Sequence, residues 1–304
     1  MIDPGGDFME IRTDLAMEVP AIQEAPAGLP EGVELRREQR HGTEATVIKL
    51  TTRSAAEAVG KPKGTYITVE LGKVLRREKE SFEGAVRAVS EYLGELMNLS
   101  ENLPVLVAGL GNREVTPDAV GPLTADHILV TRHIRKEMPK EFGHFRPVGA
   151  AVPGVLGTTG IESAETVRAL AQRTEAAAVI AVDAIAARDT QKLCSTVQLS
   201  NTGIIPGSGI GNSRCALDQE SMGIPVIAVG VPTVTDAATM AADLFSRTGR
   251  EADEQQLRQA STGMIVTSSD IDRRIREISR VLAYGINLAL QPHLSMDDLT
   301  DLTF

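Results

Sequence analysis

Apolar residues in this chain form short continuous runs that alternate with amphipathic segments. Runs without an exposed polar side are typical of strands covered on both faces. They predict strands at 104–108, 179–184 and 225–230. Apolar positions at helical spacing predict helices at 82–97, 123–135, 163–173 and 269–290. Strands interleaved with helices indicate an α/β protein with a mostly parallel, twisted sheet flanked by helices.

The N-terminal part has a different pattern. Residues 1–32 are rich in Gly, Pro, Ala and acidic residues, which predicts an extended arm. The β-branched runs at 46–50 and 65–71 predict strands. We expect these strands to form an additional small β sheet beside the main one.

Composition narrows the class of protein. The 304 residues are 42% apolar and carry 31 basic and 41 acidic side chains, a net charge of −10. With 3% aromatic residues and no basic stripe, direct nucleic-acid binding is disfavoured. No apolar run reaches the length of a membrane span, and the N-terminus does not have the pattern of a signal peptide. We therefore expect a cytoplasmic protein without membrane contact, whose Cys194 and Cys215 are reduced, buried thiols.

Two aspartates follow predicted strands at the edge where parallel sheets place their sites. Asp118 lies in a turn between Pro117 and Gly121, and Asp183 directly follows a buried run. If they share one crevice, one carboxyl becomes an acid and the other a base, and the pair can activate water and protonate a leaving amine. Two structural roles stay open: Asp118 as a helix cap, and Asp183 in an ion pair with Arg188.

The Gly-rich loop at 203–212 is a further candidate site. Its Gly207, Ser208 and Gly209 could contact a substrate, or the loop could simply lie on the surface. It lacks the Lys and Ser/Thr of a phosphate-binding P-loop. No zinc motif is present in the sequence, so we expect no metal site and no cofactor.

Several segments, taken together and in order, resemble the spore germination proteases of endospore-forming bacteria. The N-terminal one reads Arg-Thr-Asp-Leu-Ala-Met-Glu at 12–18. The others are 109–112 with 116–118, 153–162, 182–188, 206–212 and 223–234.

The resemblance implies a fold like that of hydrogenase-maturation endopeptidases, a homotetramer, and an endopeptidase made as a zymogen. The family degrades small acid-soluble proteins that coat spore DNA, which places this chain in the spore core. Residues 13–18 look like an internal copy of the substrate motif, which implies self-cleavage between Asp14 and Leu15. Residues 1–14 would then be a propeptide and 15–304 a single protease domain with insertions. The resemblance also implies that Asp118 and Asp183 are the catalytic pair.

Acidity of the arm suggests a hypothesis for control: the arm blocks the crevice, and acidification loosens it by protonating carboxylates. Two other functions stay open at this point. One is a phosphorylase or nucleotide-binding hydrolase on the same sheet, which would use loop 203–212 for phosphate. The other is a non-enzymatic binding protein.

Overall fold

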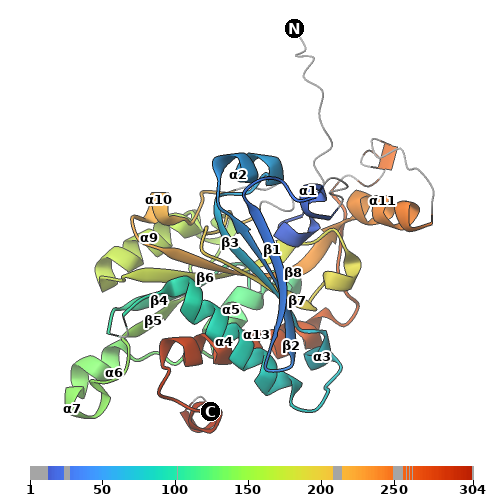
Figure 1. Ribbon diagram of the computed structural model, residues 1–304. Helices are drawn as coiled ribbons and strands as arrows, with labels where there is room; N and C mark the ends of the chain where they lie inside the picture. The colour runs from blue at the N-terminus through green and yellow to red at the C-terminus, as the bar shows by residue number, and fades with distance from the viewer. Residues whose placement is uncertain are drawn as a thin grey trace.

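The computed structural model describes residues 13–23, 28–100, 102–207, 214–248, 256–257, 259, 261 and 263–302. One nine-stranded sheet runs through the molecule, with β1 to β8 in the order β1-β2-β3-β7-β8-β6-β4-β5 (Figure 1). The short strand β9 pairs with β8. Its strands are β1 (Val33–Arg40), β2 (Thr43–Leu50), β3 (Gly64–Glu70), β4 (Val105–Gly109), β5 (Val148–Ala151), β6 (Ala178–Ala186), β7 (Thr196–Ser200), β8 (Val226–Asp236) and β9 (Ile265–Val266).

Helices connect these strands and cover both faces of the sheet. The α-helices with at least six residues are α2 (Arg53–Val59), α4 (Ser81–Met97), α5 (Val120–Ala125), α6 (Arg132–Glu137), α9 (Ser163–Thr174), α11 (Ala237–Arg247), α13 (Ile271–Leu290) and α14 (Met296–Leu302). The four-residue helices are α1 (Pro20–Gln23), α3 (Gly72–Leu75), α7 (Pro139–Phe142), α8 (Leu156–Thr159) and α10 (Gln219–Met222). Single 3-10 turns are η1 (Ala16–Glu18), η2 (Thr116–Asp118) and η3 (Thr190–Lys192).

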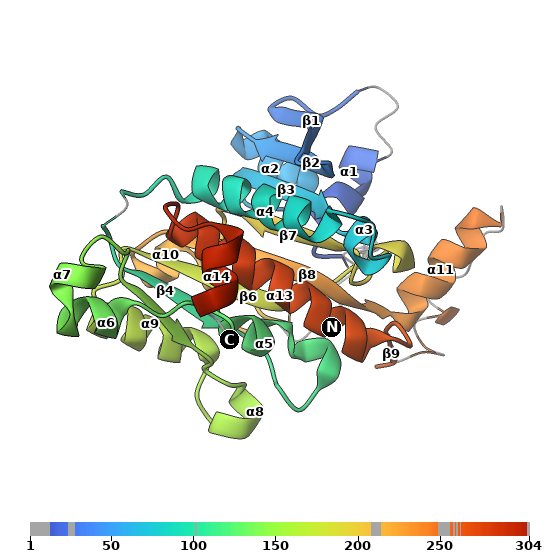
Figure 2. The same ribbon diagram turned by 90° about the horizontal axis from the view of Figure 1, so that it is seen from below.

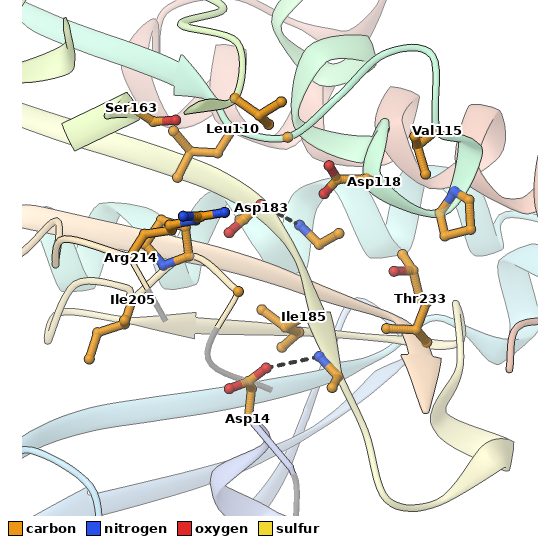
Figure 3. A pocket seen from close by; sticks show the side chains of 18 of the residues that line it. Asp14, Leu110, Val115, Asp118, Ser163, Asp183, Ile185, Ile205, Arg214 and Thr233 are labelled. Atoms are coloured by element: carbon orange, nitrogen blue, oxygen red, sulfur yellow. Dashed lines mark hydrogen bonds between the residues drawn. The ribbon is translucent and has the colours of Figure 1, made fainter. Parts of the chain in front are cut away.

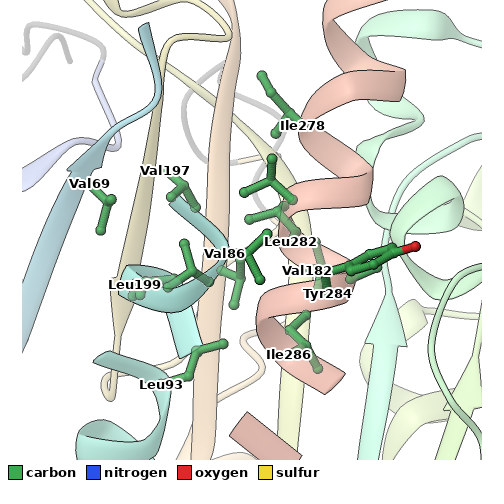
Figure 4. Packing of buried hydrophobic residues seen from close by; sticks show 14 of the residues in the cluster. Val69, Val86, Leu93, Val182, Val197, Leu199, Ile278, Leu282, Tyr284 and Ile286 are labelled. Atoms are coloured by element: carbon green, nitrogen blue, oxygen red, sulfur yellow. The ribbon is translucent and has the colours of Figure 1, made fainter. Parts of the chain in front are cut away.

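Side-chain alternation along the strands builds a core on each face of the sheet. In β6, Ile180 and Val182 belong to the cluster under α4 and α13, which lie side by side in Figure 2. Val179 and Ala181 belong instead to the cluster under α9. Figure 4 shows the first cluster, in which residues of α13 meet Val86 and the strand residues Val182 and Leu199.

The predicted α/β class is confirmed, with two corrections to its details. Parallel pairing is confined to β5, β4, β6 and β8. The N-terminal strands β1 to β3 do not form a separate small sheet, because β3 pairs with β7 and so extends the main sheet in antiparallel fashion. An antiparallel strand can face solvent on one side, so the alternating pattern of these strands suits this edge.

The predicted helices agree with α4, α9 and α13, but the one expected at 123–135 is wrong. The chain forms α5 and α6 there, with residues 126–131 between them. In this break the N–H of Leu129 donates to Asn287 Oδ1 at 2.9 Å, and the N–H of Thr131 donates to the Val148 carbonyl at 3.0 Å. Both cysteines are free; Cys194 is buried as expected, whereas Cys215 is exposed.

Candidate functional site

A cavity of about 430 Å³ opens where β4, β6 and β8 end (Figure 3). The cavity lies at the edge of the sheet where the carboxyl ends of the parallel strands meet, and where the loops that follow them begin. Its lining brings together Asp118 and Asp183, as the sequence predicts, and adds Asp14 from the N-terminal arm. Apolar residues supply most of the remaining wall, including Leu110, Ile185 and Ile205 (Figure 3).

Asp118 is held by the loop that follows β4. Its Oδ2 accepts a hydrogen bond from the Asn112 N–H at 2.8 Å. This contact requires a close approach at Gly111, where φ is +106° and a Cβ would lie 2.1 Å from the Asp118 carbonyl oxygen. Only glycine tolerates both the positive φ and the lack of room for a Cβ atom. Burial raises the pKa of Asp118, although the Asn112 N–H acts in the opposite direction.

Asp183 lies in the C-terminal half of β6, three residues before the strand ends at Ala186, and is only 4% exposed. Its Oδ1 accepts the N–H of the next residue, Ala184, at 2.9 Å (Figure 3). Burial raises the pKa of Asp183 well above its ordinary value, and the negative charges of Asp118 and Asp14 act in the same direction. A carboxylate in such a place is costly to ionise, so Asp183 is the member of the pair that holds a proton more tightly.

The arm runs beside this pair. Asp14 is bonded to Ala186 of β6 twice: its N–H donates to the Ala186 carbonyl at 3.0 Å, and its Oδ2 accepts the Ala186 N–H at 2.9 Å (Figure 3). The next side chain, Leu15, is fully buried against Ile185, Ala187 and Leu193. The bond between Asp14 and Leu15 is thus fixed next to the cavity.

Glu18 anchors the other end of this short segment. Its carboxylate accepts the N–H of Arg188 at 2.7 Å, the N–H of Asp189 at 3.0 Å, and the hydroxyl of Thr13. The side chain is buried, and burial raises the pKa of Glu18 despite these three donors. The charge of Lys61 interacts with Asp14 and Glu18, while burial lowers the pKa of this lysine.

Other sequence predictions meet different outcomes. Gly207 lines the cavity, whereas Ser208 and Gly209 lie outside the described residues. The alternative of an ion pair between Asp183 and Arg188 is wrong, because Arg188 pairs with Asp243 instead, with 3.8 Å between Arg188 Nε and Asp243 Oδ1. Arg214 also lines the cavity, but no sequence motif singled it out.

Neither a cluster of metal ligands nor a membrane-spanning helix is present among the described residues. No group of three or more His, Cys, Asp or Glu side chains there could hold a metal ion. No helix in that part of the chain is long and apolar enough to cross a bilayer.

Comparison with known proteins places the chain in a family. The family model described as germination protease matches residues 11–262. A germination protease from Caldanaerobacter subterraneus subsp. tengcongensis is 39% identical, with 96% of this chain and 98% of that protein covered. The germination protease of Priestia megaterium is 36% identical, with 93% and 87% covered.

A solved structure was also found, the [NiFe] hydrogenase maturation protease HycI from Thermococcus kodakarensis. It is 16% identical, has a TM-score of 0.35, and the match covers 64% of this chain and 98% of that one. The sequence similarity to germination proteases extends over nearly the whole chain. The chain therefore belongs to the germination protease family, a family of peptidases.

Proposed function

We propose that this chain is a self-processing endopeptidase in which Asp118 and Asp183 cut the peptide bond between Asp14 and Leu15. One observation carries the proposal: a single cavity is lined by the two aspartates and by Asp14, whose backbone is hydrogen-bonded to the strand that bears Asp183. Family membership supports peptidase chemistry over the phosphorylase and binding-protein alternatives.

The two aspartates take different roles because their surroundings differ. Asp183 is more deeply buried, and its pKa is also raised by the charge of Asp118. We assign it the proton. Asp118 is less buried and its pKa is raised less, so it is the ionised partner. Two interacting carboxyls that share one proton can work as base and acid in one reaction.

The proposed step uses a water molecule between the carboxyls. Asp118 takes a proton from the water molecule while the water oxygen forms a bond to the carbonyl carbon of Asp14. Asp183 gives its proton to the Leu15 nitrogen, and the carbon–nitrogen bond breaks. The products are a carboxyl group on Asp14 and a free amine on Leu15. A proton then returns from Asp118 to Asp183 and resets the pair.

Family membership supports our proposal for the biological role. Residues 1–14 act as a propeptide, of which only 13 and 14 are among the described residues, and 15–304 form the protease domain. The processed enzyme acts in the spore core and starts the degradation of small acid-soluble proteins that coat spore DNA. Its assembly is a homotetramer, which sedimentation equilibrium of the processed chain would test.

The pKa shifts reverse the expected effect of acid on the arm. Burial raises the pKa of Glu18 above its ordinary value near 4.5, and Asp14 of the arm adds to burial and to the charge of Asp118 in raising the pKa of Asp183. A raised pKa means that the docked arrangement binds protons more tightly than the undocked one. Its stabilising effect is full below the ordinary pKa and is lost as the pH rises through the raised value. Acid therefore favours docking of residues 13–18, and does not loosen them.

A peptide with the sequence of residues 10–21 tests the chemistry in trans. The chain, after incubation at mildly acid pH, should cut this peptide between Asp and Leu, as read by chromatography with mass spectrometry. Asp118→Asn and Asp183→Asn should each lower kcat/KM by about 10³-fold or more, since each removes one proton-transfer group.

Asp126→Asn is the matched control. Asp126 directly follows α5 and pairs with Arg113 at the surface, with 2.5 Å between Asp126 Oδ2 and Arg113 Nη1. It is not part of the cavity lining, so its loss should leave the rate within about twofold of wild type. Equal activity of all three variants would refute the role of the pair, and no cleavage by the wild type would refute the peptidase proposal for this motif.

A further inference from the structure

The side chain of Gln198 holds the arm from both sides of the bond proposed to be cut. Gln198 Nε2 donates to the Asp14 carbonyl oxygen at 3.0 Å. Gln198 Oε1 accepts the Ala16 N–H at 2.7 Å. The Asp14 carbonyl belongs to the Asp14–Leu15 peptide bond, and Ala16 is the second residue after it.

The orientation of this amide is fixed by its partners. A backbone carbonyl can only accept and a backbone N–H can only donate, so the nitrogen of Gln198 must face Asp14 and the oxygen must face Ala16. A flipped amide would place two donors together and two acceptors together. The nitrogen is therefore a true donor to the carbonyl oxygen.

The fold holds Gln198 firmly in this place. The residue is central in β7, which is paired on one side with β3 and on the other with β8. Gln198 is in register with Gly230 of β8. Ile185 fills the space beside Gly230, since its Cδ1 lies 2.8 Å from where a Cβ would be. A side chain anchored in the middle of a sheet is a more rigid support than one on a loop.

A donor at this carbonyl has a chemical consequence. When water attacks the carbonyl carbon, negative charge develops on the carbonyl oxygen, and a preplaced N–H stabilises it. The second contact, with the Ala16 N–H, fixes the chain on the leaving side of the bond. Both contacts are made to backbone atoms, so any extended peptide that enters in the same register can use them.

We propose that Gln198 is a catalytic residue that grips the substrate backbone on both sides of the scissile bond and polarises its carbonyl group. This inference rests on the proposed function, because it takes Asp14–Leu15 as the bond that is cut. It extends that function by adding a third group to the aspartate pair. It also assigns the surface formed by Gln198 and Ala186, on which residues 14–16 lie, to extended peptide substrates.

The test measures the first-order rate of self-cleavage in the full chain by intact-protein mass spectrometry. Gln198→Ala should slow the reaction by about 10²–10³-fold, the usual loss when one donor to a developing oxyanion is removed. Gln198→Glu separates the two contacts. Its carboxylate still accepts the Ala16 N–H but cannot donate to the carbonyl, so at neutral pH it should be as slow as Gln198→Ala.

The pH dependence of the cleavage rate distinguishes a catalytic role of Gln198 from a merely structural one. As the pH falls, protonation of the new carboxyl in Gln198→Glu restores a donor, so its rate should rise more steeply than that of wild type. Gln39→Ala, at an exposed glutamine on β1, is the matched control and should cleave at the wild-type rate. Thermal unfolding of every variant checks that the sheet is intact.

The outcomes separate the two proposals. If wild type stays uncut, the proposed self-cleavage fails and the role of Gln198 fails with it. If wild type is cut and Gln198→Glu is cut equally fast at neutral pH, the aspartate pair stands and only the role of Gln198 is overturned.

Discussion

Truncation of Leu15 to alanine tests how the arm is held. Leu15 is fully buried against Ile185, Ala187 and Leu193. The change removes three carbons, worth about 2.4 kcal/mol at about 0.8 kcal/mol each. The cavity left behind raises the loss to about 3–5 kcal/mol. Because about 1.4 kcal/mol corresponds to a factor of ten, opening of the arm should become about 10²–4×10³-fold more frequent.

Amide hydrogen exchange measures this opening directly. The Asp14 N–H is bonded to the Ala186 carbonyl and the Ala16 N–H to Gln198, so both exchange only when the arm leaves. Their exchange should accelerate by the factor given above, while amides in the middle of β6 keep their protection. Leu15→Met is the matched control and should change exchange by less than about tenfold, since it conserves volume. Unchanged exchange in Leu15→Ala would show that this apolar contact does not hold the arm.

Four further results are expected. Self-cleavage should be faster at mildly acid than at neutral pH, because docking weakens as the pH rises through the raised pKa of Glu18; equal rates would contradict this. Asp183→Asn should abolish cleavage yet raise stability at neutral pH by about 1–3 kcal/mol, seen as a higher Tm whose excess shrinks in acid. Gly111→Ala should lower the Tm and the activity through its clash with Asp118, whereas Gly157→Ala, with open space around it, should do neither. Iodoacetamide at pH 8 should label exposed Cys215 and spare Cys194, whose pKa burial raises to about 12; equal labelling would contradict the burial.

Local sequence signals predicted the parts of the fold that depend on local physics. The unbroken apolar run before Asp183 identifies β6 because a strand covered on both faces needs no polar side. The location of Asp118 after β4 then follows from the gathering of loops at one edge of a parallel sheet, whereas β6 does not end at Asp183 but continues to Ala186. Both residues do line one cavity.

Long-range contacts are what the sequence did not predict. Apolar spacing in residues 126–131 looks helical, but hydrogen bonds to Asn287 and to β5 override it. The pairing of β3 with β7 joins segments far apart in the chain, and no residue pattern in either strand identifies the strand it pairs with. The role of Gln198 could not be predicted from the sequence either, because it depends on a contact with Ala16, 182 residues away in the chain.

The most direct test of the central claim is the intact mass of the purified chain held at mildly acid pH, beside Asp118→Asn and Asp183→Asn. The account predicts that wild type loses a fragment ending at Asp14, so that the remaining chain begins at Leu15, and that both variants keep their full mass. A wild-type chain that stays whole, or a variant that is cut at the same bond as fast as wild type, would contradict it.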